Sequence, residues 1–229
     1  FPLTKIQAEK SQRFRIFTLH YLIFFMIKRI LFALLFLTIS NAAFSQMDLF
    51  PHTKSKWVDS VMKSLSIDQK IGQVLMPRGN SNPSYDTTRL YEIVRNYHVG
   101  GFVLFAGYPT TQARLVNKLQ AMSKVPMFIG MDLEWGLNMR LDSTVRYPYQ
   151  MTLGAIQGND ALIEKMGFQI AQQCKRMGVH INYAPVVDVN NNPNNPVINF
   201  RSFGENRDAV TSKSLAYMRG LQKGGIITS

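Results

Sequence analysis

Cysteine is almost absent from the 229-residue chain, which contains only Cys174. A single cysteine excludes a disulfide framework and a thiolate metal cluster within the chain. Cys174 lies in "FQIAQQCKRMG", a segment with helical spacing, where we expect a free, buried thiol rather than a nucleophile. No cysteine directly follows the apolar N-terminal segment, so the sequence does not support a lipid-anchored N-terminus either.

Charged residues are also scarce, at 17%, whereas hydrophobic residues make up 46% of the chain. This balance excludes a disordered chain and predicts a buried core. The net charge of +12 would suit a nucleic acid or an anionic surface, but much of the excess lies near the N-terminus. Without residues 1–45 the chain has 20 basic against 13 acidic residues, a net charge of +7 without any basic block longer than a pair. We therefore expect no nucleic-acid partner.

Motifs for nucleotide binding and serine-based hydrolysis are missing as well. No G-x-G-x-x-G or G-x-x-x-x-G-K-[ST] follows the first expected strand, so the sequence has neither of the usual motifs for nucleotide phosphate binding at that position. No G-x-S-x-G is found, and the histidines after residue 45 are only His52, His98 and His180. His180 begins an apolar strand, a position typical of a core histidine rather than of a catalyst. A Ser-His-Asp triad is therefore not supported.

One segment partly matches a calcium-binding loop. Asp188, Asn190 and Asn192 fit the D-x-N-x-N start of such a loop. Pro193 and Asn199, however, stand where the loop requires glycine and glutamate. We predict no metal and no cofactor.

The N-terminal region has the layout of a secretory signal. Residues 26–45 start with methionine, place two basic residues before an apolar run, and end in small residues, which predicts cleavage between Ser45 and Gln46. The run is too short to span a bilayer comfortably, although "FTLHYLIFF" upstream leaves a retained anchor as the alternative. Residues 1–25 begin with Phe1 and are expected to be upstream sequence read in frame. We expect a periplasmic or secreted protein without a stable membrane anchor after cleavage.

From residue 54 onward one unit recurs: an amphipathic helix, a glycine, and a short apolar strand. Its strands are expected in "IGQVLM", "FVLF", "MFIGMD", "VHINYAPVVDV" and "IIT". Asn159 and Asn206 are expected N-caps, and Gly178 and Gly224 are expected C-terminal stops. Such alternation predicts an α/β fold with parallel strands, either an open doubly wound sheet or a (β/α)₈ barrel. Polar residues gather after the third and fourth strands, which favours the barrel.

The barrel prediction concerns residues 46–229, a shorter stretch than the about 250 residues of a typical (β/α)₈ domain. The chain stops within "GGIITS", inside an expected strand. We therefore expect about the first half of a TIM barrel, truncated near strand five.

Carboxylates and arginines follow two of the strands. Asp132 ends the third strand, with Glu134 and Arg140 shortly after it. The fourth strand leads to Asp188, five asparagines and Arg201. Such groups could grip the adjacent hydroxyls of a sugar, or they could form Asp132–Arg140 and Asp188–Arg201 ion pairs that only tie loops together. Spacing alone leaves both interpretations open, and it leaves the tryptophan at position 135 open between sugar stacking and core packing.

The linked motifs resemble a known family. "VPMFIGMDLEWGLNMRL", "INYAPVVDVNNNPNNPVINFRSFGE" and "GLQKGGIITS" are similar to the opening half of a family 3 glycoside hydrolase, and most similar to its bacterial β-N-acetylhexosaminidase branch. A β-glucosidase or β-xylosidase of the same family is the second choice. A non-catalytic carbohydrate-binding or scaffold remnant is the alternative from another class.

The resemblance implies a retaining glycosidase acting on β-linked N-acetylglucosamine, for instance in peptidoglycan fragments. It implies that Asp132 grips sugar hydroxyls and that Arg140 and Arg201 help to hold the same sugar. The family's Lys-His segment, acid/base loop and nucleophile are expected beyond Ser229, so no catalytic residue is assigned and the fragment alone is expected to be inactive. Glu134 is expected to be structural. Trp135 stands where most members of the branch have glycine, which changes the expected shape of the pocket.

Overall fold

The computed structural model describes residues 26, 28–29 and 55–229. The chain divides into two units, Phe1–Ser55 and Lys56–Ser229, and nearly all described residues belong to the second. Most of the expected signal segment, residues 26–45, lies outside the described residues, as do residues 1–25 and the cleavage site. The three described residues of that segment are helical. No helix in the described part of the chain is both long and apolar enough to cross a membrane.

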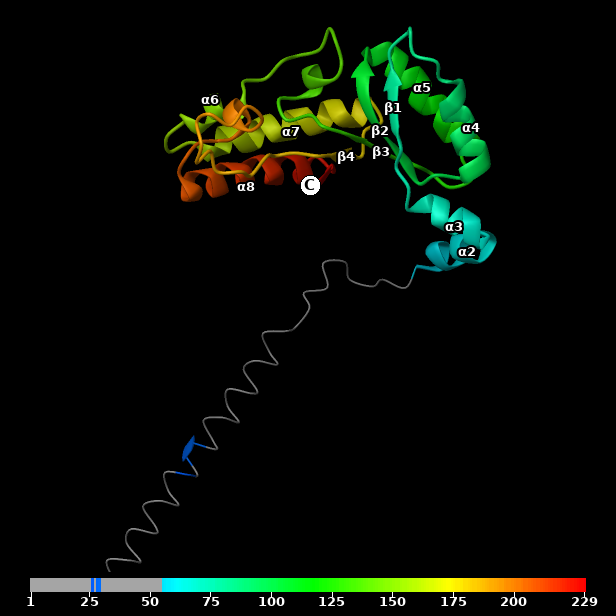
Figure 1. Cartoon of the computed structure of the whole chain (residues 1–229), viewed down its shortest axis with the longest axis horizontal. Helices are drawn as coiled ribbons and strands as arrows, with labels where there is room; N and C mark the ends of the chain where they lie inside the picture. The colour runs from blue at the N-terminus through cyan, green and yellow to red at the C-terminus, as the bar shows by residue number, and fades with distance from the viewer. Residues whose placement is uncertain (1–25, 27, 30–54) are drawn as a thin grey trace, which may run out of the picture. The chain divides into compact units, whose positions relative to one another are not determined.

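The second unit contains a five-stranded parallel sheet in the order β1-β2-β3-β4-β5 (Figure 1). A doubly wound sheet reverses its strand order at a switch point, whereas a (β/α)₈ barrel adds each strand beside the preceding one. The observed order follows the chain without reversal, and the predicted partial barrel is confirmed. The strands are β1 (Arg78–Ser81), β2 (Gly101–Gly107), β3 (Phe128–Met131), β4 (Ile181–Asn182) and β5 (Ile227–Thr228).

Helices connect these strands, and the four predicted amphipathic segments are helical. The α-helices are α2 (Lys56–Ser64), α3 (Ile67–Gln73), α4 (Thr88–Tyr97), α5 (Pro109–Met122), α6 (Gln150–Gly154), α7 (Asp160–Arg176) and α8 (Arg207–Lys223), and the 3₁₀ turns are η1 (Leu137–Met139) and η2 (Asn199–Arg201). Asn206 caps α8 by accepting a hydrogen bond from the Ala209 amide at 2.9 Å, as predicted. Asn159 occupies the N-cap of α7 without a side-chain bond. Gly178 follows α7 with φ of +67°, a conformation that suits glycine.

The first strand was placed wrongly by the sequence pattern. Half of "IGQVLM" belongs to α3, and β1 begins only at Arg78. The reason is a capping box: Ser66 accepts from the Gln69 amide, and the Gln69 side chain accepts from the Ser66 amide. This S-x-x-Q signal begins a helix and outweighs the apolar run that resembles a strand.

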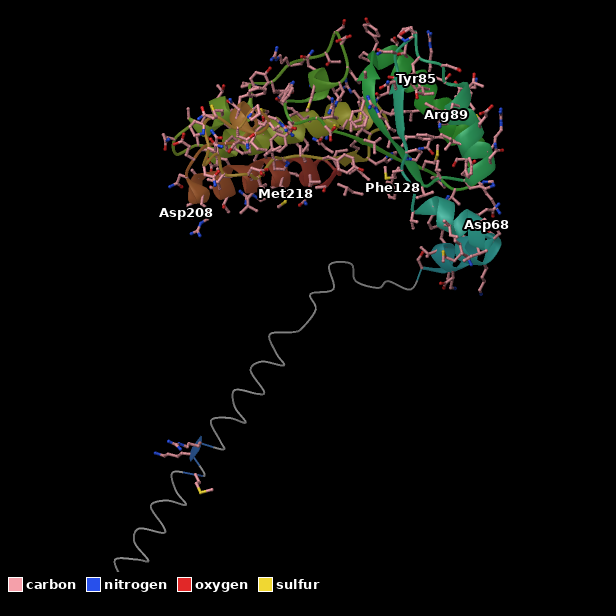
Figure 2. The ribbon with its side chains drawn as sticks, in the orientation of Figure 1. Asp68, Tyr85, Arg89, Phe128, Asp208 and Met218 are labelled. Carbon is pink, nitrogen blue, oxygen red and sulfur yellow. The ribbon has the colours of Figure 1, made fainter. Side chains whose placement is uncertain are left out.

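The sheet has two unequal faces. Phe102, Leu104, Ile129 and Met131 are fully buried beneath the helices. On the other face, Val103 and Phe105 are partly exposed, and Phe128, labelled in Figure 2, is 48% exposed. Because side chains alternate along a strand, Asp132 follows β3 in phase with the accessible face.

Helices α7 and α8 lie side by side and form the most extensive helix contact of the described chain (Figure 1). Glycines allow this close approach. A Cβ atom at Gly220 would lie 2.1 Å from the carbonyl oxygen of Glu164, and one at Gly167 would lie 2.5 Å from that of Tyr217. Any side chain larger than that of glycine would therefore overlap backbone atoms at this crossing.

Gly220→Ala in the complete protein is expected to lower the free energy of unfolding of this domain by about 2 kcal/mol. The loss is expected although alanine has the higher helix propensity, because the added methyl group meets backbone atoms rather than a flexible side chain. Urea unfolding measures it, with Leu215→Ala on the exposed side of the same helix as control, expected to cost less than about 1 kcal/mol. A Gly220→Ala protein as stable as the wild type would contradict the close packing.

Candidate carbohydrate-binding site

Asp132 and Arg140 form an ion pair at the carboxyl end of β3. Arg140 Nη2 donates to Asp132 Oδ2 at 2.5 Å, and the two side chains remain 28% (Asp132) and 24% (Arg140) exposed. The chain between them returns to the end of β2, where the Gly107 amide donates to the Arg140 carbonyl at 3.1 Å. Leu141 is fully buried beside this contact. The loop is thus fixed by its backbone, and its charged pair stays accessible.

Glu134 and Arg201 form a second and more enclosed pair. Arg201 Nη2 donates to Glu134 Oε1 at 2.6 Å, and Arg201 Nε lies 3.0 and 3.1 Å from the two carboxylate oxygens. The Glu134 side chain is only 2% exposed, whereas that of Arg201 is 29% exposed. Glu134 therefore has the structural role expected of it. The alternative partner, Asp188, is exposed and forms no ion pair with Arg201.

The charge of Arg201 is stabilised by its surroundings. Its pKa is raised chiefly by the side-chain hydrogen bonds to Glu134, with smaller contributions from the charges of Glu134, Asp132 and Asp188. The charge of Asp132 helps to raise the pKa of Arg201, although the two residues are far apart in sequence. The predicted strand-end residues therefore share one electrostatic environment. The structure brings Asp132, Arg140 and Arg201 to the ends of neighbouring strands, as the sequence predicted.

The backbone at Leu133 and Glu134 is held by a layer of buried polar side chains. Asn182 Oδ1 accepts from the Leu133 amide at 2.9 Å, and Gln150 Nε2 donates to the Glu134 carbonyl at 2.6 Å. The Tyr217 hydroxyl donates to the same carbonyl at 3.0 Å, and burial raises the pKa of this phenol well above its usual range. A neutral phenol remains a donor at all physiological pH values. These residues fix the backbone segment that carries the Glu134 side chain.

The asparagine-rich loop after β4 is folded upon itself. Ser202, fully buried, donates from Oγ to the Asp188 carbonyl at 2.6 Å and so closes the loop. Asn192 Oδ1 accepts from the Asn194 amide at 3.0 Å, and Asn195 Oδ1 accepts from the Val197 amide at 2.9 Å. These local bonds are the ones that asparagine commonly makes in turns. The loop therefore delivers η2 and Arg201 to the site in a defined conformation.

Sequence reasoning missed two further residues at the site. The guanidinium carbon of Arg140 lies 4.9 Å from the centre of the Phe105 ring, and that of Arg78 lies 4.6 Å from it. Arg140 Nε is buried without a hydrogen-bond partner in the described part of the chain. The stacking orients Arg140 through its planar face. Arg78 was not identifiable because the strand that carries it was placed too early.

Trp135 is half-buried in a cluster of rings. Its ring centre lies 4.8 Å from that of Tyr149 and 6.1 Å from that of Phe200. The structure therefore assigns it to packing contacts between loops.

Of two residues that the sequence assigned to the core, Cys174 is found there, whereas His180 is only partly buried. His180 Nδ1 accepts from the Ile129 amide at 3.1 Å, and partial burial lowers the pKa of its imidazole. Cys174 is fully buried and free, and burial raises the pKa of its thiol to about 12. Neither residue contacts the strand-end pairs.

At pH 8, iodoacetamide is expected to leave Cys174 unmodified in the folded protein and to alkylate it in urea. A pKa near 12 leaves only about one thiol in ten thousand ionised at this pH, and the thiolate is the reactive form. Because the unfolded thiol ionises from its ordinary value of 9.0, this residue also makes folding less favourable as the pH rises from about 9 towards 12. The mass of the peptide containing Cys174 gives the result. Rapid labelling of folded protein would contradict the burial.

A partial (β/α)₈ barrel with carboxylate–guanidinium pairs at the carboxyl ends of its strands is typical of an enzyme domain that handles polar substrates. Residues 66–229 match the N-terminal domain of glycosyl hydrolase family 3. The chain belongs to this family, and the predicted resemblance is confirmed.

Individual relatives agree with the assignment. The chain is 31% identical over 191 residues to β-hexosaminidase A of Pseudoalteromonas piscicida, an alignment that covers 72% of this chain and 32% of the relative. It is 28% identical over 174 residues to a β-N-acetylglucosaminidase/β-glucosidase of Cellulomonas fimi, covering 76% of this chain and 30% of the relative.

A solved family 3 β-N-acetylglucosaminidase from Paenibacillus sp. superposes with a TM-score of 0.64 at 32% identity, covering 72% of this chain and 32% of that one. The matched region thus amounts to about a third of each of these relatives.

Proposed function

We propose that the complete protein is a retaining β-N-acetylhexosaminidase that hydrolyses β-linked N-acetylglucosamine. The observation that carries the proposal is the convergence of Asp132, Arg140 and Arg201 at the ends of neighbouring strands. The names of the relatives support the choice of sugar.

The chemistry of these groups suits an N-acetylated sugar. A carboxylate such as Asp132 accepts hydrogen bonds from adjacent hydroxyls, and a guanidinium donates to hydroxyl or acetamido oxygens. Asp132 is partly accessible and pairs with the Arg140 guanidinium, so its carboxylate is placed to accept hydrogen bonds from sugar hydroxyls. Retaining hydrolysis commonly uses two carboxyl groups about 5–5.5 Å apart, one as nucleophile and one as acid/base. We assign neither role to Asp132 or Glu134.

The activity is tested with the complete protein and nitrophenyl N-acetyl-β-glucosaminide. We expect steady release of nitrophenol from the complete protein and none from residues 46–229 alone. Failure of the complete protein to hydrolyse this substrate would contradict the proposed function, and activity of residues 46–229 alone would contradict the placement of the catalytic carboxylates outside this chain.

A β-glucosidase is the second candidate, because the Cellulomonas fimi relative is named for both activities. The matching nitrophenyl β-glucoside, assayed in parallel, separates the two. We expect a higher kcat/KM for the N-acetylated substrate, because the guanidinium groups give the acetamido oxygen a charged donor. The opposite preference would favour the glucosidase.

We further propose that the protein is periplasmic or secreted and that it acts on peptidoglycan fragments or related glycans. The signal layout of residues 26–45 supports the location. N-terminal sequencing of protein recovered outside the cytoplasm is expected to start at Gln46. A mature protein that retains residues 26–45 would contradict signal cleavage.

A further inference from the structure

Three aromatic rings join the two segments that carry the Glu134–Arg201 pair. Trp135 directly follows Glu134, and Phe200 directly precedes Arg201. Tyr149, at the N-cap of α6, lies between them: its ring centre is 4.8 Å from that of Trp135 and 4.5 Å from that of Phe200. The Trp135 and Tyr149 rings meet edge to face at 83°. This arrangement is the favourable one for aromatic pairs.

The Trp135 and Tyr149 rings belong to backbone segments that are hydrogen-bonded to each other. The Trp135 carbonyl accepts from the Tyr147 amide at 3.2 Å, which ties the loop after β3 to the segment before α6. Gln150, fully buried, reinforces this link through its bond to the Glu134 carbonyl. Trp135 and Tyr149 therefore form a preformed surface that does not depend on η2.

The third ring belongs to η2, the short turn that carries Arg201. η2 has three residues, and Asn199 adopts a φ of +35°, a conformation that residues other than glycine rarely take. Val197 is 61% exposed and Phe200 is 41% exposed, so the side of the turn that precedes Arg201 is open to solvent. Within this stretch the Phe200 ring provides the aromatic contact with the rest of the site.

We propose that Trp135 is a positioning residue for substrate binding. With Tyr149 it holds the Phe200 ring, and this contact fixes η2 so that Arg201 reaches the Glu134 carboxylate and presents its guanidinium to the sugar. The inference rests on the proposed function, in which Arg201 contacts N-acetylglucosamine. Trp135 acts through Phe200 and Arg201, because its ring is engaged by two other rings.

The test uses the complete protein with Trp135→Ala, the conservative Trp135→Phe, and a matched control. Phe168→Ala removes an aromatic side chain of 37% exposure from α7, outside the cluster. We expect Trp135→Ala to raise both the KM for nitrophenyl N-acetyl-β-glucosaminide and the inhibition constant of free N-acetylglucosamine about tenfold, with kcat changing less, because ground-state binding is lost. Trp135→Phe should restore both constants to within about threefold of the wild type, since a ring remains. Phe168→Ala should change neither.

A second readout does not depend on activity. Hydrogen–deuterium exchange of the peptide covering residues 197–203 is expected to become faster in Trp135→Ala and to remain slow in Phe168→Ala. Lack of activity in the wild-type protein would contradict the proposed function alone, and the exchange of this peptide would still decide the role of Trp135.

Two results would overturn the positioning role. One is unchanged exchange and unchanged constants in Trp135→Ala. The other is weaker binding of N-acetylglucosamine oligosaccharides with unchanged binding of the monosaccharide, which would make the indole a stacking platform for a further sugar.

Discussion

Replacing Asp132 with alanine in the complete protein is expected to lower kcat/KM for nitrophenyl N-acetyl-β-glucosaminide by about a hundredfold. The side chain is the accessible carboxylate of the strand-end pairs, and it is held in place by Arg140 at 2.5 Å. Its loss removes charge-assisted hydrogen bonds to the sugar and also frees the Arg140 guanidinium to move. Asp132→Asn keeps the shape but not the charge, and should lose nearly as much activity because the amide accepts less strongly.

Asp188→Ala is the matched control for this prediction. Asp188 is an exposed aspartate that follows the neighbouring strand, and it influences Arg201 only through its charge. We expect its loss to change kcat/KM less than about threefold, as for other exposed charges. Near-wild-type activity in Asp132→Ala, or equal losses in the two variants, would contradict the sugar-gripping role of Asp132.

Replacing Arg201 with alanine is expected to lower the free energy of unfolding of the domain by about 3 kcal/mol, in addition to impairing binding. The reason is the carboxylate left behind: the Glu134 side chain is 2% exposed, and its charged partner in the described chain is Arg201. Breaking an enclosed pair on one side costs more than the pair itself contributes, because the remaining charge stays desolvated. Urea unfolding followed by circular dichroism measures the loss.

Two variants control this experiment. Arg207→Ala breaks the Arg207–Asp208 pair, whose side chains are 84% and 85% exposed, and should cost less than about 1 kcal/mol. The double variant Glu134→Gln/Arg201→Ala removes the stranded charge and should regain a large part of the stability lost in Arg201→Ala, although not its activity. A double variant no more stable than Arg201→Ala would show that the loss does not come from the Glu134 charge.

Much of the fold follows from local sequence signals. The four amphipathic helices were predicted from their apolar spacing, and α7 and α8 also from their asparagine caps and terminal glycines. The first strand was misplaced, because an apolar run is ambiguous between helix and strand, and the capping box at Ser66 decided in favour of helix. The short α6 and the two 3₁₀ turns depend on tertiary contacts, such as that of Gln150 with the Glu134 carbonyl, and have no strong local signal.

The Asp132–Arg140 pair was one of the arrangements that the spacing left open, whereas the observed partner of Arg201 was not predicted. Parallel strands place their carboxyl ends at one edge, so the convergence of Asp132, Arg140 and Arg201 could be foreseen. Spacing could not show that Arg201 would pair with Glu134 rather than Asp188. That choice depends on which carboxylate is enclosed, and the backbone that carries Glu134 is held by Tyr217, Gln150 and Asn182 on distant elements. The packing of Trp135 likewise depends on Phe200, which lies 65 positions further along the chain.

The two ion pairs differ in what they offer a ligand. Asp132 and Arg140 are similarly exposed and can both turn towards a sugar, whereas Glu134 is enclosed and exposes only its partner, Arg201. The account therefore predicts that Asp132, Arg140 and Arg201 contact the substrate and that Glu134 does not.

A crystal structure of the complete protein with N-acetylglucosamine bound tests this prediction most directly. The account predicts one sugar at the carboxyl ends of β3 and β4, with a hydroxyl within about 3 Å of an Asp132 oxygen and the guanidinium of Arg201 against the same sugar. A sugar bound away from Asp132, or one contacted by Glu134 with Arg201 turned away, would contradict it.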